Sequence, residues 1–260
     1  MVTSHLLALR RSITLLGIFT IIVLVQWPLR IVGFHSGYKL GHTWHKLCRW
    51  AIGMRIRSYG SISMESPTFF VANHTSYLDI PALGSLVDGT FIAKSEIKSW
   101  PMFGTLCSLQ RTIFIDRDWR KARAQRKQLY KRLDDGDSLI LFPEGTSNNG
   151  TFTRRFKSAL FSAADWNLDN QGLAVQPITI AYTRLNDIVI GRRLRPLFAW
   201  YGDMVMFDHF WTLLGSGSLG VDIIFHPPVR LKNFGSRKEL SRHCERRVSN
   251  GLSDALAGRL

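Results

Sequence analysis

The sequence is poor in cysteine. Its 260 residues include three cysteines, Cys48, Cys107 and Cys244, an odd number at wide spacing. This pattern argues against a disulfide framework and favours a reducing compartment, and no Cys/His spacing typical of a zinc site is present. The chain also lacks a Gly-x-Ser-x-Gly segment, and none of the cysteines lies in a nucleophile motif. The sequence therefore offers no candidate for covalent catalysis.

Acidic residues are also few. The chain has 19 Asp and Glu against 34 Lys and Arg, which gives a formal net charge of +15. Such a cationic surface fits nucleic acid, an anionic bilayer or the phosphates of acyl-coenzyme A. Helix-turn-helix, zinc-finger and RNA-binding signatures are lacking, so we expect an anionic membrane and no nucleic acid as partner. No metal motif is found, because Asp134, Asp135 and Asp137 flank Gly136 as in a helix-to-strand turn.

One apolar run approaches the length of a membrane span. It covers 12–29, which is 18 residues against the ~20 that cross a bilayer as a helix, and Arg10, Arg11 and Arg30 flank it. A cleaved signal peptide is the alternative, but no small-x-small cleavage site follows. Because arginines lie on both sides, the positive-inside rule does not decide its orientation.

The next segment, 38–52, has apolar residues at helical spacing and basic residues on other faces. This pattern is typical of a helix at a membrane interface and equally of a helix that packs on a globular core, and it leaves both open. We predict two parts, membrane-anchoring helices over 1–54 and a catalytic domain over 55–260. The chain is too short for two ordinary enzymes.

Apolar runs and helical stretches alternate along the rest of the chain. A basic helix is expected over 119–133 and a polar C-terminal helix over 236–257. The alternation predicts an α/β fold, with a mixed, mostly parallel sheet flanked by helices and with reactive loops at strand ends. The expected strands are 69–72, 91–93, 112–115, 138–142, 175–181, 198–201 and 221–225.

A histidine and an aspartate follow the first expected strand. His74 and Asp79 lie between the apolar run 69–72 and a second apolar stretch, 77–86, that is compatible with a helix. A carboxylate bonded to one ring nitrogen of histidine fixes the tautomer and leaves the other nitrogen free to take a proton from a hydroxyl. The spacing predicts a general base with its orienting partner, although a pair that only caps a helix has the same spacing.

Polar residues also follow the later strands. They are Lys94 after 91–93, Arg117 after 112–115, the segment Phe-Pro-Glu-Gly-Thr-Ser at 142–147, and Pro177 close behind Val175. Together with His74 and Asp79, this ordered set resembles the sequence blocks of the glycerolipid acyltransferase family, over roughly residues 45–230. One residue departs from the family pattern, because Thr112 stands where glycine is common.

The resemblance implies an enzyme and assigns roles to these residues. His74, oriented by Asp79, takes the proton from a lysolipid hydroxyl, which attacks an acyl thioester directly and forms no acyl-enzyme. Arg117 binds the acceptor's phosphate with its planar guanidinium, and an ion pair with Asp116 or Asp118 is the alternative. The other acceptor-binding candidates are Lys94, which is weaker, and Glu144, Gly145, Thr146 and Ser147 in the tight turn.

The reaction predicted from the resemblance is the acylation of lysophosphatidic acid to phosphatidic acid, in phospholipid biosynthesis. The blocks recognise only a hydroxyl and an anionic group, so another lysolipid such as lyso-ornithine lipid is an alternative acceptor. A non-catalytic membrane protein that binds anionic lipid is an alternative of another class. No cofactor and no metal are expected, and the donor is acyl-coenzyme A or acyl carrier protein. Both donors are cytosolic, so we expect the catalytic domain on the cytoplasmic side of a bacterial inner membrane.

Two further segments have open roles. The basic stretch 153–157 either guides the donor's phosphates or begins a solvated helix. A set of aromatic residues either lines an acyl groove or packs in the core, and its members are Trp200, Tyr201, Phe207, Phe210 and Trp211.

Overall fold

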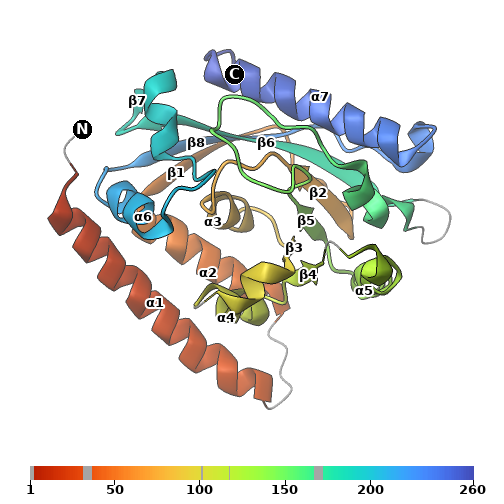
Figure 1. Ribbon diagram of the computed structural model, residues 1–260, viewed down its shortest axis with the longest axis horizontal. Coiled ribbons are helices and arrows are strands. Elements are labelled where there is room, and N and C mark those ends of the chain that lie inside the picture. Colours follow the sequence, from red (N-terminus) through yellow and green to blue (C-terminus); the bar gives the residue numbers. More distant parts are fainter. Residues whose placement is uncertain (1–2, 32–36, 101, 117, 167–171) are drawn as a thin grey trace.

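The computed structural model of the chain describes residues 3–31, 37–100, 102–116, 118–166 and 172–260. A central sheet carries helices on both faces (Figure 1). The α-helices are α1 (His5–Ile31), α2 (Gly37–Ile52), α3 (Asp79–Gly84), α4 (Phe103–Leu109), α5 (Ala122–Asp134), α6 (Met206–Leu214) and α7 (Arg237–Leu256). The strands are β1 (Met54–Tyr59), β2 (Thr68–Ala72), β3 (Thr90–Lys94), β4 (Ile113–Ile115), β5 (Leu139–Leu141), β6 (Ala174–Leu185), β7 (Ile188–Val189) and β8 (Leu219–Phe225). Short 3₁₀ helices are η1 (Ser95–Ser99), η2 (Trp119–Lys121), η3 (Ser158–Asp165), η4 (Arg192–Leu197) and η5 (Leu231–Asn233).

The strands form one mixed sheet in the order β1-β8-β6-β2-β5-β3-β4, with β7 paired to the end of β6. The neighbours β6, β2, β5, β3 and β4 run parallel. Strand β8 is antiparallel to β6 and parallel to β1. This arrangement confirms the predicted α/β fold with a mostly parallel sheet. Because parallel strands have their carboxyl ends at one edge, the loops after β2, β3, β4 and β5 meet there.

The central strand β2 divides the core into two layers. All of its residues are buried, and successive side chains of a strand point to opposite faces. Phe70 packs in a cluster with residues of α1, α2, α3 and α6, whereas Phe69 packs with residues of α5, η3 and α7. The two sets of helices therefore cover opposite faces of the sheet (Figure 1).

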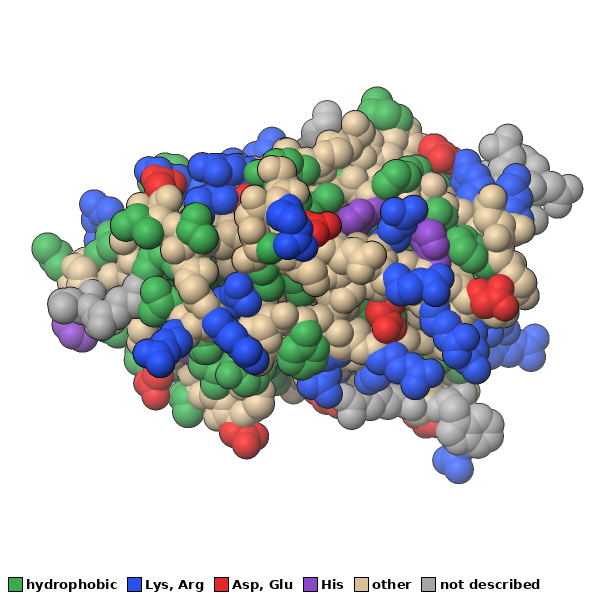
Figure 2. All heavy atoms as spheres, turned by 90° about the horizontal axis from the view of Figure 1, so that it is seen from above, with side chains coloured by type: hydrophobic (Ala, Val, Ile, Leu, Met, Phe, Trp, Pro, Cys, Tyr) green, Lys and Arg blue, Asp and Glu red, His purple; other side chains and the backbone are tan. Residues whose placement is uncertain are grey.

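The face that α7 covers is cationic. Figure 2 looks down on this face and shows Lys and Arg side chains scattered across it. The exposed residues of α7 include Lys238, Arg242, Arg246 and Arg247. Basic side chains are thus spread over this face of the molecule.

Some elements differ from the prediction. Residues 198–201 form no strand. Phe198 is fully buried and stacks on Tyr182, with ring centroids 5.4 Å apart, so the apolar character of this run reflects core packing. Strand β1 contains no continuous apolar run, because the exposed Arg55 and Arg57 alternate with apolar residues, and it is absent from the expected strands for this reason. The helices expected over 38–52, 119–133 and 236–257 are present as α2, η2 with α5, and α7.

Helix α1 is apolar and long enough to cross a membrane, judged by length and composition. It also packs on the globular part, where Ala8 belongs to the core cluster that contains Phe70. Nη1 of Arg11 donates to the carbonyls of Leu214 at 2.9 Å and Gly217 at 2.8 Å. The helix is therefore fixed at its first turns, while most of its apolar surface stays exposed. The division of the chain at residue 54 stays a prediction.

Replacing Arg11 with methionine tests how firmly α1 is fixed. Methionine keeps an apolar stem but donates no hydrogen bond, so the free energy of unfolding should fall by about 1.5–3 kcal/mol, the usual contribution of hydrogen bonds to a charged group. Chemical denaturation in detergent measures the difference. The control is Arg10→Met, because Arg10 is exposed. Equal free energies of unfolding for Arg11→Met and Arg10→Met would contradict this docking of α1.

Candidate active site

The carboxyl ends of the parallel strands bring the predicted site residues to one edge of the sheet. His74 follows β2, and Glu144 follows β5, which pairs directly with β2. Lys94 is half-buried and ends β3, the next strand beyond β5. Arg117 lies outside the residues that the structure describes. The structure therefore places together the histidine and the glutamate that the sequence had assigned to separate blocks.

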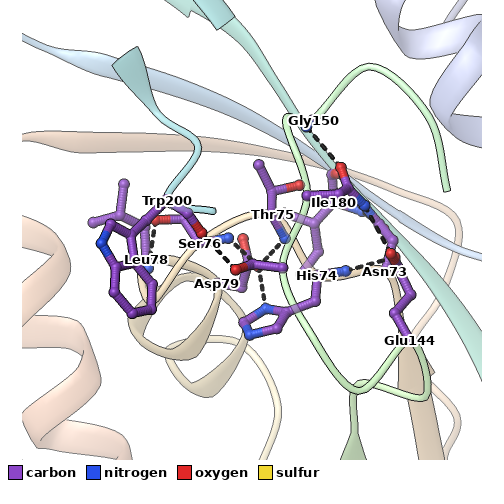
Figure 3. A network of polar contacts seen from close by, with 12 residues as sticks. Asn73, His74, Thr75, Ser76, Leu78, Asp79, Glu144, Gly150, Ile180 and Trp200 are labelled. Carbon is purple, nitrogen blue, oxygen red and sulfur yellow. Dashed lines mark hydrogen bonds and ion pairs between the residues drawn. The ribbon is translucent and has the colours of Figure 1, made fainter. Parts of the chain in front are cut away.

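The imidazole of His74 is held by a buried carboxylate. Nδ1 of His74 lies 2.8 Å from Oδ2 of Asp79, whose side chain is fully buried (Figure 3). The same oxygen accepts the backbone N–H groups of Thr75 at 2.7 Å and Ser76 at 2.9 Å. Oδ1 accepts the hydroxyl of Tyr182 at 2.7 Å. Burial, and then the charge of Asp79, raises the pKa of Tyr182 well above its ordinary value, so this hydroxyl keeps its proton.

This set of donors fixes the tautomer of His74. A carboxylate that accepts backbone N–H groups and a phenol is in its charged, acceptor-only form. Nδ1 of His74 must then carry the hydrogen that the 2.8 Å contact requires, and Nε2 is left with its lone pair. The arrangement matches a general base that is ready to take a proton.

The ring of His74 is also fixed from one side. It stacks on Phe142, with ring centroids 4.3 Å apart and planes 13° apart. Its side chain remains 22% exposed, so a substrate hydroxyl can approach it. Phe142 in turn stacks on Phe91 of β3. The orientation of the base thus depends on packing against the neighbouring parallel strands.

Glu144 connects the two loops of the site. It is 2% exposed, and Oε1 accepts the backbone N–H of His74 at 2.9 Å (Figure 3). Oε2 accepts Nδ2 of Asn148 at 2.7 Å and the backbone N–H of Arg154 at 3.0 Å. Burial raises the pKa of Glu144 from 4.5 to about 7, although these donors oppose the shift. Both oxygens are bonded to the chain itself, so in this structure Glu144 positions His74.

Gly145, Thr146 and Ser147 complete the tight turn after β5. Gly145 has a φ of +71°, in the left-handed region that favours glycine, and a Cβ there would lie 2.8 Å from Nζ of Lys157. Thr146 is exposed, whereas the hydroxyl of Ser147 donates to the carbonyl of Trp200. The basic stretch 153–157 begins no helix, since η3 starts at Ser158. It places the Lys157 ammonium against Gly145.

Some residues that build the site carry no obvious sequence signal. Nδ2 of Asn73 donates to the carbonyl of Ile180, and Oδ1 accepts the Ile180 N–H, both at 2.8 Å. These bonds fix the start of the loop 73–78, which we call the catalytic loop, to β6. Tyr182 comes from the same strand, far from Asp79 in sequence. Only its place on one face of β6, two residues beyond Ile180, relates it to the site.

The predicted aromatic set is divided by the fold. The backbone of Trp200 accepts from Ser147 and donates to the carbonyl of Thr75 at 3.1 Å, so this residue lies beside the catalytic loop. Its ring is near Tyr77 and meets Trp100 edge-on at 6.1 Å. Phe210 contacts the same Tyr77 ring from α6. Tyr201 is half-buried, and Phe207 and Trp211 stack on each other on α6.

The thiols of the chain are poorly suited to attack. Burial raises the pKa of Cys48 and of Cys244 to about 12 each, and it raises that of Cys107 as well. A nucleophilic cysteine instead needs a lowered pKa. Among the described residues, no group of histidine, cysteine and acidic side chains is arranged to hold a metal ion.

Comparisons with known proteins agree with this geometry. The family model described as Acyltransferase matches residues 54–181. The Lyso-ornithine lipid O-acyltransferase of Brucella abortus is 38% identical over 242 residues, which cover 91% of each chain. The 1-acyl-sn-glycerol-3-phosphate acyltransferase of Neisseria gonorrhoeae is 31% identical over 155 residues, 59% of this chain and 57% of that one.

The fold also matches a solved structure. The crystal structure of the 1-acyl-sn-glycerophosphate acyltransferase PlsC from Thermotoga maritima aligns with a TM-score of 0.68 at 22% sequence identity. The alignment covers 96% of this chain and 94% of that one. At this identity the likeness concerns the fold.

The exchange Asp79→Asn tests the carboxylate that orients the base. An asparagine can place its oxygen toward the three N–H donors and its amide toward the Tyr182 hydroxyl, so the loop should keep its shape while the negative charge is lost. We expect acyl-transfer turnover to fall by about 10²–10⁴-fold, the usual contribution of general base catalysis. The control is Asp254→Asn on α7. Turnover in Asp79→Asn close to that of the control would refute the role.

The exchange Glu144→Gln tests the connection between the loops. Each carboxylate oxygen faces an N–H donor, so the amide of glutamine must meet one of them, at a cost of about 1–3 kcal/mol in the free energy of unfolding. The control is Glu65→Gln, whose side chain is 46% exposed and lies before β2, at the opposite edge. Chemical denaturation that shows no difference between these variants would contradict the bonding.

The pH dependence of stability gives a second test of Glu144. Between pH 4.5 and about 7 the native state holds a proton that the unfolded state has released. The contribution of Glu144 to stability therefore falls as the pH rises through this window and is constant above it. Glu144 thus contributes a negative slope to the plot of unfolding free energy against pH, and in Glu144→Gln the slope in this window should be less negative or more positive. An unchanged slope would show that Glu144 titrates normally.

Proposed function

The chain belongs to the acyltransferase family, and from this premise we propose that it moves a fatty acyl group from a thioester donor to the free hydroxyl of lyso-ornithine lipid. Acyl transfer to a lysolipid agrees with the family and with the names of its relatives, and lyso-ornithine lipid is the acceptor that we propose. The acceptor rests on one observation: the likeness to a Lyso-ornithine lipid O-acyltransferase extends over nearly the whole of both chains.

Lysophosphatidic acid is the second candidate acceptor. The likeness to a 1-acyl-sn-glycerol-3-phosphate acyltransferase supports it, but over little more than half of the chain. The sequence blocks of the site serve a hydroxyl and an anionic group, which both lysolipids have. The comparisons thus favour the acceptor that the sequence blocks give only as the alternative.

His74 and Asp79 form a dyad whose geometry supports a direct transfer. Nε2 of His74 takes the proton of the acceptor hydroxyl while its oxygen attacks the thioester carbonyl carbon. Asp79 stabilises the imidazolium that forms, because its charge lies 2.8 Å from Nδ1. The tetrahedral intermediate then collapses, the carbon–sulfur bond breaks, and the imidazolium returns the proton to the leaving thiolate. Holding both substrates in place contributes on the order of 7–11 kcal/mol to such a reaction.

The acceptor's anionic group needs cationic or amide partners at the same edge. We assign this role to Arg117 and Lys94, to the backbone of Gly145 and to the exposed hydroxyl of Thr146. The ammonium of Lys157 joins them, because it lies against Gly145. A lysophosphatidic acid would offer a phosphate here, and a lyso-ornithine lipid the carboxylate of its amino-acid head group. Glu144 and Ser147 hold the turn in position.

The place of the reaction follows from its substrates. The acceptor and the product are bilayer lipids, and α1 offers an apolar helix to the membrane. The donor, acyl-coenzyme A or acyl carrier protein, is water-soluble and cytosolic. We therefore assign the catalytic domain to the cytoplasmic side of a bacterial inner membrane, with α1 as its anchor and no cofactor beyond the donor.

The first test measures free thiol released from acyl-coenzyme A in liposomes, with lyso-ornithine lipid and lysophosphatidic acid as separate acceptors. The proposal predicts a higher kcat/KM for lyso-ornithine lipid and a loss of about 10²–10⁴-fold in His74→Ala, which removes the base. The matched control is His243→Ala on α7, which should keep full turnover because His243 contacts Phe234, away from the site.

The outcomes separate the proposals. A higher kcat/KM for lysophosphatidic acid would replace the acceptor and keep the mechanism. Turnover that survives in His74→Ala would refute the mechanism. Binding of anionic lipid without thiol release from either acyl-coenzyme A or acyl carrier protein would support a non-catalytic lipid-binding protein instead.

A further inference from the structure

The end of β6 carries an exposed surface that the reaction does not use. Strand β7 and the following η4 expose Ile188 at 71%, Val189 at 74% and Leu194 at 41%. Arg192 and Arg193 are exposed among them. We call these five residues the β7 tip. Large apolar side chains next to arginines on one projecting turn are typical of a surface that meets a membrane.

The β7 tip lies at the carboxyl end of β6, which continues beyond the end of β2 that leads to the site. Ala72, the last residue of β2, lies opposite Ile178 of β6. Strand β6 continues for seven more residues to Leu185, about 23 Å at the usual rise of a strand, before the turn to β7. His74 follows Ala72 at the same end. The tip and the catalytic loop therefore both lie at the carboxyl ends of their strands, at the same end of the parallel pair β2 and β6.

The tip is also connected to α1. Asn186, in the turn before β7, exchanges hydrogen bonds with Ser218, its N–H donating to the Ser218 carbonyl at 2.8 Å and its Oδ1 accepting the Ser218 N–H at 2.8 Å. The carbonyl of the preceding residue, Gly217, accepts a hydrogen bond from the guanidinium of Arg11. In Figure 1, β7, α6 and the first turns of α1 all lie at the left of the molecule.

We propose that the β7 tip is a second membrane contact, which docks on the surface of an anionic bilayer beside α1. The first turns of α1 also carry exposed apolar side chains, Leu6 and Leu9. Arginines near an anionic membrane surface contribute about 1 kcal/mol each, and apolar side chains add the burial of their own area. The acidic Asp187 does not oppose this docking, because Arg55 pairs with it.

Charge alone does not distinguish the β7 tip, because helix α7 is also basic (Figure 2). The β7 tip differs in combining arginines with exposed aliphatic residues. A second contact at the tip, added to that of α1, restricts the orientation of the molecule as well as its attachment. The edge that holds His74 then faces the bilayer, where a lysolipid can enter without leaving the membrane.

The test uses the full chain, in which α1 keeps the protein on vesicles whatever the tip does. An environment-sensitive fluorophore is attached at Ile188→Cys, in a Cys107→Ser background because Cys48 and Cys244 are buried. The matched site is Asn250→Cys, which is exposed on α7. Lipids with brominated acyl chains quench a fluorophore that enters the bilayer. The β7 tip should be quenched several-fold more than the α7 site.

The charge is tested in the same assay. Arg192→Glu together with Arg193→Glu should lower the quenching at residue 188 in vesicles with phosphatidylglycerol, whereas Arg246→Glu with Arg247→Glu, a matched change on α7, should leave it unchanged. Quenching at residue 188 no greater than at residue 250 would overturn the proposal, as would equal quenching in anionic and neutral vesicles. The readout needs no turnover, so it can fail or succeed independently of the acceptor's identity.

Discussion

A buried carboxylate holds the site together. Asp79 has no exposed surface, and a charge in that position is tolerable only because every bond it can accept is provided by the chain. Two backbone N–H groups, the Tyr182 hydroxyl and the His74 imidazole supply those bonds. The charge of Asp79 in turn decides which nitrogen of His74 carries hydrogen. The tautomer of His74 thus follows from one electrostatic requirement, and the stacking on Phe142 holds the ring in place.

The fold meets this requirement by placing three strands side by side. Strand β2 ends at the catalytic loop, β5 on one side supplies Phe142 and Glu144, and β6 on the other supplies Tyr182. The side chain of Asn73 joins the loop to β6. Because these elements are far apart in sequence and adjacent only in the sheet, the topology of the sheet is what surrounds His74 and Asp79 with their supporting residues. The same topology carries β6 past the site to the β7 tip, so catalysis and the proposed orientation on the membrane depend on one strand.

The parts that the sequence predicts are those encoded locally. His74 and Asp79 are only five residues apart, and short continuous apolar runs are typical of buried strands, so the pair, the sheet and its mostly parallel character can be predicted. Tyr182 and Asn148 cannot, because their role depends on long-range pairing. The run 198–201 looks like a strand but packs against Tyr182 in the core. Glu144 was assigned to substrate from its motif, whereas its burial, which no local pattern reveals, gives it bonds to the chain itself.

The tautomer of His74 is the most direct test of this account. Long-range ¹H–¹⁵N correlation spectra of the protein labelled with ¹⁵N-histidine, with His74→Ala to assign the signal, distinguish a protonated from an unprotonated ring nitrogen. We expect that, above the pKa of the ring, Nδ1 carries the hydrogen and Nε2 does not, and that Asp79→Asn weakens this preference. A neutral His74 with its hydrogen on Nε2 would refute its role as general base, because that nitrogen could not then take a proton from the acceptor.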